Sequence, residues 1–222
     1  GIFWTLTTGG TLVIPKKRIE QDVDNLAEII SKNKISHTLM LPSLYNLLLE
    51  HAPTEKLESL NTIMVAGEAC SSEVVQRHFK TLPTARLYNE YGPTEGTVWC
   101  TAHEIRPENA AGAVPIGRPI PNVQNYILDK NQQPVPTGVA GELYIGGETL
   151  SSGYLNRPEL TAEKFVTVFF NESQPTRLYR TGDLAKYQND GVIEFLGRAD
   201  HQIKIRGYRI EPDEIKAVLL RQ

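Results

Sequence analysis

The sequence predicts an α/β fold: a mainly parallel sheet with flanking helices, followed by a small β-barrel-like subdomain. Two observations carry this prediction. Up to about residue 110, short apolar runs typical of strands alternate with segments of helical periodicity, the pattern of parallel strands joined by right-handed crossovers. After residue 103, proline and glycine become frequent and the apolar runs stay short, as in a small barrel or a curled sheet.

The first part of the chain divides into alternating strands and helices. Ser43 can cap a helix that follows a strand, and Glu73 suits the first turn of a later helix that starts at Ser71 or Ser72. Strands are predicted at residues 11–14, 35–41, 60–66 and 86–90, and helices at residues 22–32, 43–49 and 71–80.

The second part consists of short strands separated by turn signals. Hairpin tips are predicted at residues 129–133 and 189–191, and a helix begins near Pro212, which suits a first helical turn. Strands are predicted at residues 123–128, 141–145, 177–179, 192–196 and 202–206. We expect boundaries that give the regions 1–110, 111–197 and 198–222.

Composition restricts the class of protein. A net charge of −3 over 222 residues gives no reason to expect a nucleic-acid partner, which normally requires a basic surface. Cys70 and Cys100 are too few for a disulfide framework, so we predict a cytoplasmic protein, and no apolar run is long enough to predict a membrane span. The chain opens without Met and stops inside a helical pattern, so we expect a piece of something longer.

The segment NEYGPTE, residues 89–95, follows a predicted strand, and open α/β sheets bind ligands at such strand ends. Tyr91 offers a flat face to a nucleobase, and Gly92 lets the backbone approach a ligand closely. Thr94 offers a hydroxyl to phosphate, and Glu95 could hold Mg²⁺, which proteins bind through one or two carboxylates plus substrate phosphates. An ordinary Gly-Pro turn explains the same residues about equally well.

Two later segments carry further candidates. In YRTGDL, Asp183 follows a tight glycine turn and could accept hydrogen bonds from both hydroxyls of a ribose, although a polar hairpin turn is the plainer interpretation. In GRADHQIKIRG, Arg198 and Lys204 could contact phosphate or ribose oxygens, although a solvated strand face explains the same charges. The glycine-rich GELYIGG lacks the Gly-Lys-Ser/Thr of a P-loop, and the histidines lack metal-ligand spacing.

Together and in this order, NEYGPTE, GELYIGG with GYLNRPELTAEKF, YRTGDL and GRADHQIKIRGYRIEPDEI resemble the core motifs of amino-acid adenylation domains of non-ribosomal peptide synthetases, within the adenylate-forming superfamily. The resemblance covers essentially the whole chain. It implies ATP-dependent activation of an amino acid to an aminoacyl-adenylate, and then transfer to the phosphopantetheine thiol of a carrier protein. A peptidyl carrier protein and neighbouring synthetase domains are the implied partners, and Mg²⁺ is an implied cofactor.

The resemblance also implies roles for individual residues. Asp200 is the hinge of a small C-terminal α+β lid domain that starts within residues 198–222, and Lys204 and Gly207 face the site during thiol transfer. Thr94, Glu95 and Lys204 are the implied catalytic residues, with Glu95 as the metal ligand. The implied ATP-binding residues are Gly67, Glu68, Ala69, Asn89, Tyr91, Thr94, Asp183 and Arg198. The implied substrate pocket consists of Met40, Met64, Ala66, Glu90, Val98 and Trp99.

Alternatives remain at this point. An acyl- or aryl-CoA ligase shares the nucleotide motifs, and a catalytically silent interaction module is a reading of a different class. The resemblance also implies that the phosphate-binding loop lies before Gly1 and a catalytic lysine after Gln222, so we expect this piece to be inactive alone. The two methionines and Trp99 suggest an apolar substrate side chain, whereas Glu90 suggests a polar or cationic one.

Overall fold

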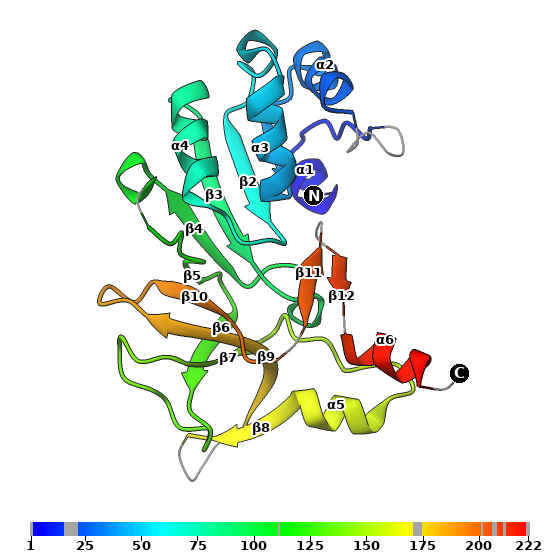
Figure 1. The fold of residues 1–222 in the computed structure, drawn as a ribbon, viewed down its shortest axis with the longest axis vertical. Coiled ribbons are helices and arrows are strands. Elements are labelled where there is room, and N and C mark those ends of the chain that lie inside the picture. The colour runs from blue at the N-terminus through cyan, green and yellow to red at the C-terminus, as the bar shows by residue number, and fades with distance from the viewer. Residues whose placement is uncertain are drawn as a thin grey trace. The chain divides into compact units, whose positions relative to one another are not determined.

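The computed structural model describes residues 2–15, 22–110, 112–170, 175–200, 202–205, 208–210 and 212–220 (Figure 1). The chain divides into two compact units. Unit 1 comprises residues 1–89 and 104–114, and unit 2 comprises residues 90–103 and 115–222. The division expected at residues 110 and 197 stays a prediction.

The first sheet has the order β1-β2-β3-β4-β5, and unit 1 contains its helices together with β1, β2 and most of β3. Strands β1 and β2 are parallel, with His37 opposite Thr62 and Met40 opposite Val65, and β5 joins β4 in the antiparallel sense. From the start of the chain to the end of this sheet, the elements are α1 (Ile2–Thr7), α2 (Val23–Asn33), β1 (His37–Met40), α3 (Pro42–His51), a 3-10 turn (Thr54–Lys56), β2 (Thr62–Ala66), α4 (Ser72–Thr81), β3 (Arg86–Tyr91), a 3-10 turn (Thr94–Gly96), β4 (Thr101–Ile105), a 3-10 turn (Pro107–Ala110) and β5 (Arg118–Pro119).

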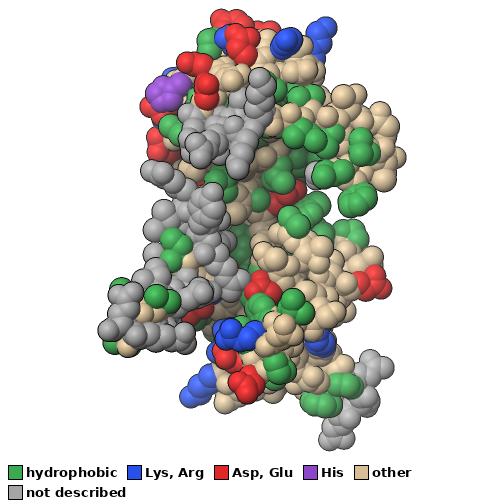
Figure 2. All heavy atoms as spheres, turned by 90° about the vertical axis from the view of Figure 1, so that its right-hand side faces the viewer, with side chains coloured by type: hydrophobic (Ala, Val, Ile, Leu, Met, Phe, Trp, Pro, Cys, Tyr) green, Lys and Arg blue, Asp and Glu red, His purple; other side chains and the backbone are tan. Residues whose placement is uncertain are grey.

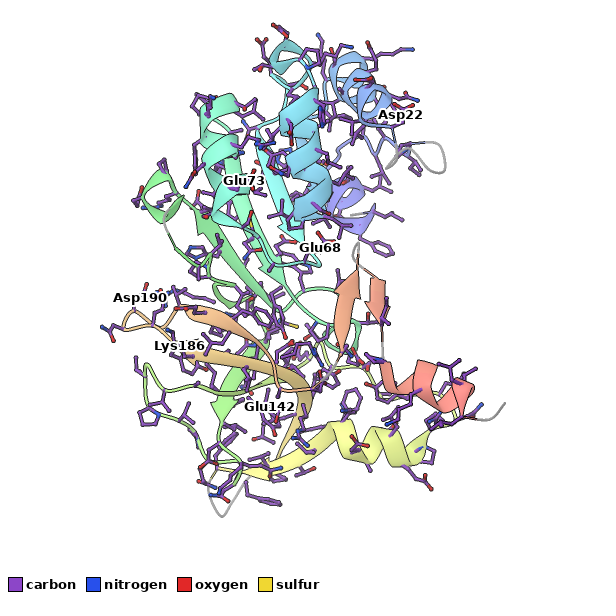
Figure 3. The ribbon with its side chains drawn as sticks, viewed as in Figure 1. Asp22, Glu68, Glu73, Glu142, Lys186 and Asp190 are labelled. Carbon is purple, nitrogen blue, oxygen red and sulfur yellow. The ribbon has the colours of Figure 1, made fainter. Side chains whose placement is uncertain are left out.

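The helices of unit 1 begin where the sequence supplies a start signal. Asp22 caps α2 by accepting a hydrogen bond from Asn25 N at 3.0 Å (Figure 3). Ser71 caps α4 by accepting from Val74 N at 3.4 Å. Helices α3 and α4 contact each other, and α3 also contacts β2 (Figure 1). No helix among the described residues has both the length and the hydrophobicity needed to cross a membrane.

The core of unit 1 is aliphatic, with one buried polar network inside it. Leu48, Ile63 and Leu87 are fully buried in this core. The Tyr45 hydroxyl lies 2.6 Å from His78 Nδ1, and His78 Nε2 lies 3.0 Å from the Ala85 carbonyl oxygen. Because a carbonyl can only accept, Nε2 carries the ring proton and Nδ1 accepts from Tyr45.

Unit 2 contains an antiparallel sheet of order β10-β9-β7-β6, with β8 also paired to β9, and a separate hairpin of β11 and β12 (Figure 1). Its core includes Ile127, Leu143, Ile145 and Ile193. The elements are β6 (Val123–Leu128), β7 (Gly141–Gly147), α5 (Pro158–Lys164), β8 (Phe165–Phe169), β9 (Pro175–Tyr187), β10 (Ile193–Arg198), β11 (Ile203–Ile205), β12 (Tyr208–Ile210) and α6 (Pro212–Leu219).

The predicted fold class is confirmed, because helices and a partly parallel sheet are followed by a curled antiparallel sheet and then by a hairpin with a helix. The predicted hairpin tip at residues 189–191 joins β9 to β10, and Figure 3 labels Asp190 in that tip and Lys186 on β9 before it.

Some predicted elements were wrong. Residues 11–14 form no strand, and Ile14 is 77% exposed there, because a four-residue apolar run gains nothing from strand geometry without a neighbour to pair with. Ser43 does not cap α3, which begins one residue earlier at Pro42 with Leu41 as its N-cap. Proline suits this position because its missing N–H would have no helical partner there.

Helix α1 was not predicted. It buries none of its side chains, and Ile2, Phe3 and Trp4 are exposed. Hydrophobic side chains reach the surface at several points of the face shown in Figure 2.

Candidate functional site

A bulge in β9 contains Asp183, the predicted ribose-binding residue. Glu142 of β7 pairs with Leu184 and Tyr144 pairs with Arg180, so Leu143 alone stands opposite residues 181–183. On the other edge of β9, Arg198 of β10 lies directly opposite Asp183. Bulges re-aim side chains and are frequent beside active sites. The bulge therefore places the Asp183 carboxylate beside the end of β10.

The Asp183 carboxylate is held by two side chains that are distant in sequence. The Tyr91 hydroxyl donates to Asp183 Oδ2 although the two residues are 92 positions apart, and Arg198 Nη1 donates to Oδ1 at 2.7 Å. Tyr91 is 9% exposed and Asp183 5%. Burial and the adjacent carboxylate raise the pKa of Tyr91 well above its ordinary value, so the phenol stays protonated and donates.

Arg198 also donates hydrogen bonds to Asp200, the predicted hinge residue. Its Nε and Nη2 atoms each lie 2.6 Å from a carboxylate oxygen of Asp200, in the forked geometry that a guanidinium favours. Partial burial acts to raise the pKa of Asp200, but the hydrogen bonds and charge of Arg198 outweigh it and hold this pKa below its usual range. One arginine thus bridges the candidate ribose carboxylate and the candidate hinge carboxylate.

The loop after β3 presents the predicted metal ligand. Thr94 is exposed, whereas Glu95 is 7% exposed and accepts a hydrogen bond from the Tyr154 hydroxyl at 2.6 Å. Ser151 N donates to the Glu95 carbonyl at 2.9 Å, and Thr97 Oγ1 donates to the Thr149 carbonyl at 2.6 Å. The segment from residue 149 to 154 therefore fixes both the backbone and the carboxylate of this loop.

The next residues of the loop are strained. Thr97 and Val98 have φ values of 59° and 77°, which β-branched residues rarely adopt, and Trp99 N bonds the Thr97 carbonyl at 3.1 Å across a tight turn centred on Val98. Such strain clusters at functional sites. Val98 is 67% exposed and Trp99 38%. Two of the predicted pocket residues are therefore held at the surface of unit 2 by an unfavourable backbone.

Glu90 is the third predicted pocket residue in unit 2. It lies on β3 and is 8% exposed. Burial raises the pKa of its carboxyl to about 7.

The remaining predicted contacts lie in unit 1. Gly67, with a φ of 89°, follows β2, and the half-buried Glu68 accepts a hydrogen bond from Ser43 N at 3.3 Å (Figure 3). Asn89 is 3% exposed near the end of β3. Met40, Met64 and Ala66 are half-buried on β1 and β2, and Ala69 is exposed after β2.

The structure describes one of the two predicted thiol-transfer residues. Lys204 lies on β11 opposite Arg209 of β12. Gly207 lies outside the described residues.

Sequence reasoning missed two residues that hold the site. Tyr154 lies within the quoted GYLNRPELTAEKF segment, but nothing in its spacing links it to Glu95, which is 59 residues away. Glu142 lies in GELYIGG, and its carboxylate accepts from Gly182 N at 3.1 Å within the bulge. The acidic residue in an otherwise apolar strand run was the signal for Glu142.

Known proteins resemble this chain along nearly its whole length. The family model described as AMP-binding enzyme matches residues 1–155. Tyrocidine synthase 3 of Brevibacillus parabrevis is 42% identical over 219 residues, which are 99% of this chain and 3% of that protein. Bacitracin synthase 3 of Bacillus licheniformis is 47% identical over 221 residues, again 99% of this chain and 3% of that protein.

Among solved structures, PA1221, described as an NRPS protein containing adenylation and PCP domains, has a TM-score of 0.82 at 30% identity and matches 89% of this chain and 40% of its own.

The chain belongs to the AMP-binding enzyme family. The resemblance to amino-acid adenylation domains of non-ribosomal peptide synthetases is confirmed, because the relatives are peptide synthetases matched along almost the whole chain. The chain spans only about 3% of the length of those two synthetases.

Proposed function

We propose that this chain is part of an adenylation domain that activates an amino acid with ATP and passes it to a carrier protein. The observation that carries the proposal is the cluster of Tyr91, Asp183 and Arg198, which joins three of the motif segments in one buried site. The similarity to peptide synthetases and to a structure containing adenylation and PCP domains supports the same function.

In this proposal the cluster binds the nucleoside. Asp183 accepts hydrogen bonds from the ribose hydroxyls, because a carboxylate has two acceptor oxygens with about four lone-pair sites. Tyr91 stacks on adenine, and Asn89 is a further ATP-binding residue. Gly67, Glu68 and Ala69 line the adenine pocket, and the positive φ of Gly67 supports a close backbone approach there.

Thr94 and Glu95 serve the phosphates. No cluster of three or more metal-ligating side chains occurs within the described residues. A single buried carboxylate fits Mg²⁺, because this ion is usually bound by one or two carboxylates together with substrate phosphates. Glu95 would hold the ion, which would supply positive charge beside the phosphates, and the exposed Thr94 hydroxyl would donate to a phosphate oxygen.

The proposed chemistry has two steps. A carboxylate oxygen of the amino acid attacks the α-phosphorus of ATP, so a new O–P bond forms while the bond to the pyrophosphate oxygen breaks and pyrophosphate leaves with the electron pair. The phosphopantetheine thiolate then attacks the acyl carbon, and AMP leaves. Both steps bring anions together, so positioning and positive charge supply the main catalytic effect.

The second step is assigned to residues 198–222, proposed as the hinge and the start of a C-terminal domain. Asp200 is the pivot, and its two bonds to Arg198 support a hinge that is anchored to the end of β10. Lys204 and Gly207 would face the phosphopantetheine thiol after rotation.

The amino-acid side chain would lie against Met40, Met64, Ala66, Glu90, Val98 and Trp99. The buried Glu90 carboxyl, with its pKa raised to about 7, is in part protonated near neutral pH and can then donate a hydrogen bond to a polar substrate. The methionines and Trp99 favour an apolar one.

The decisive test is carboxylate-dependent ATP–pyrophosphate exchange by the complete protein that contains this chain, against a panel of amino acids, fatty acids and aryl acids. We expect exchange with one amino acid or a few similar ones. Exchange with fatty or aryl acids alone would move the protein to the CoA-ligase class, and no exchange in a folded protein would favour a silent interaction module.

Two variants separate the proposed half-reactions. Glu95→Ala should lower exchange, because it removes the proposed Mg²⁺ ligand. Lys204→Ala should leave exchange nearly intact and slow thioester formation on the carrier protein by about tenfold or more, since its charge would act only in the second step. Loss of exchange in Lys204→Ala would refute the assignment of this residue to thiol transfer.

A further inference from the structure

The β9 bulge is an unfavourable conformation that other residues must hold. Three residues of β9 face Leu143 alone, and Gly182 has a φ of 75°. This φ favours glycine, and a Cβ on Gly182 would lie 2.6 Å from Asp200 Oδ2 and 2.7 Å from Arg198 Nη2, so both of those side chains would have to move. Because the extra residues interrupt the ladder, their backbone groups require partners from elsewhere.

Partners for these groups come from both neighbouring strands. On the β10 side, Arg198 Nη2 donates to the Thr181 carbonyl at 3.2 Å and Ala199 N donates to the Gly182 carbonyl at 2.8 Å. On the β7 side, the Thr181 hydroxyl donates to the Leu143 carbonyl at 2.6 Å and accepts from Asp183 N at 3.0 Å. Gly182 N donates to Glu142 Oε1 at 3.1 Å. Glu142 is thus the β7 side chain that binds the bulge backbone.

The Glu142 carboxylate is itself oriented. Arg180 Nε lies 3.0 Å from both of its oxygens, and the Glu142 side chain is 15% exposed (Figure 3). Arg180 is more exposed, at 48%, so the ion pair alone would contribute little to stability. Its geometric effect is larger, because it fixes the rotamer that points Oε1 at Gly182 N.

We propose that Glu142, oriented by Arg180, is a positioning residue that holds Asp183 in place for the nucleotide. The contact runs from the Glu142 carboxylate to Gly182 N, and Asp183 is the next residue of the same bulge. This inference rests on the proposed function, in which Asp183 binds the ribose hydroxyls.

The test compares binding of ATP with binding of 2′,3′-dideoxy-ATP, which lacks both ribose hydroxyls. The two dissociation constants are measured by calorimetry in the complete protein, so the amino-acid substrate need not be known. Their ratio reports the ribose contact, whereas a general loss of structure weakens both nucleotides alike. Glu142→Ala should lower the preference for ATP by about threefold to tenfold, the range of one ordinary hydrogen bond.

Matched variants sharpen the test. Glu142→Gln retains an acceptor oxygen for Gly182 N and should keep most of the preference. Glu194→Ala removes a comparable glutamate of the same sheet, with 17% side-chain exposure and an ion pair to Lys186 at 3.3 Å, and should leave the ratio unchanged. Arg180→Ala removes only an exposed side chain, so it should fold even if Glu142→Ala does not, and it should shift the ratio in the same direction by less.

The outcomes separate the two proposals. If Asp183→Ala keeps the full preference for ATP, the ribose assignment fails and the inference fails with it. If Asp183→Ala loses the preference but neither Glu142→Ala nor Arg180→Ala lowers it, the ribose assignment stands and the positioning role of Glu142 is refuted. Glu142→Ala added to Asp183→Ala should cause no further loss of preference.

Discussion

The two units bury polar groups in opposite ways. In unit 1 the buried network of Tyr45, His78 and the Ala85 carbonyl is neutral, since burial lowers the pKa of His78 and its ring carries one proton. In unit 2 the buried polar groups include the carboxylates of Asp183 and Glu95, with Arg198 against Asp183. Burying charge is costly, whereas a satisfied neutral network costs little. The neutral network of unit 1 therefore suits packing, whereas the buried charges of unit 2 suit the binding of charged or polyhydroxylated ligands.

The largest effect should come from the charged cluster. Asp183→Ala should weaken ATP binding about 10-fold to 150-fold, the range for losing charge-assisted hydrogen bonds worth about 1.5–3 kcal/mol. Calorimetric titration with ATP measures it. If the affinity for ATP changes by less than twofold, the buried charge of unit 2 does not serve nucleotide binding.

The neutral Tyr45–His78 network of unit 1 should affect stability and not nucleotide binding. Tyr45→Phe removes the donor to His78 Nδ1 inside the core, and it should lower the free energy of unfolding by about 1–3 kcal/mol while leaving ATP affinity unchanged. Chemical denaturation measures the first quantity, and Tyr88→Phe, a half-buried tyrosine of unit 1, is the control. Reduced ATP affinity in Tyr45→Phe alone would show that the neutral network is not merely structural.

A smaller effect is expected where a neutral group supports a charged one. Tyr154→Phe removes the hydrogen bond to Glu95 Oε1 and should raise the Mg²⁺ concentration needed for half-maximal ATP–pyrophosphate exchange by about twofold to tenfold. The free energy of unfolding is measured in parallel. If stability falls and the Mg²⁺ requirement does not move, Tyr154 fixes the loop without tuning the carboxylate.

The last expected effects are two responses of stability to pH, of opposite sign. The folded-state pKa of His78 lies below its ordinary 6.5, so the unfolded chain binds more protons there, and this contribution to stability is present above pH 6.5 and is lost as the pH falls below it. The pKa of Glu90 is raised from 4.5 to about 7, so its contribution is full below pH 4.5 and is lost as the pH rises to about 7.

Substitutions isolate these two responses. His78→Gln should remove the loss of stability that occurs as the pH falls below 6.5. Glu90→Gln should remove the loss of stability that occurs as the pH rises to about 7. Both are measured as denaturation midpoints between pH 4 and 8, roughly the range that spans both ionisations. A His78→Gln protein that keeps the full acid-side loss would assign that loss to other groups.

Local signals predicted much of this fold. Helices with caps, such as α2 behind Asp22 and α4 behind Ser71, and strands ended by turn residues depend on a few neighbouring positions, and they were predicted well. The predicted strand at residues 11–14 failed because strand formation depends on a partner that the sequence does not specify.

The candidate site was predicted only as separate motifs. Tyr91, Asp183 and Arg198 were each named from their segments, but their meeting depends on a register in which Leu143 faces three residues of β9. Hydrophobic patterning fixes which side chains face the core and does not reveal such an insertion. The contacts from Glu142 to Gly182 N and from Tyr154 to Glu95 arise from that register and from the loop at residues 149–154, so spacing could not predict them.

Strand β9 changes neighbours along one edge. Residues 175–179 pair with β8, and residues 183–187 pair with β10, so the bulge occupies the interval between the two partners. A shift of register in the β8 half therefore need not propagate into the half that carries Asp183. Under the proposed function, changes in the residues of β8 that pair with β9 should therefore disturb Asp183 less than changes in β10, which lies directly opposite it.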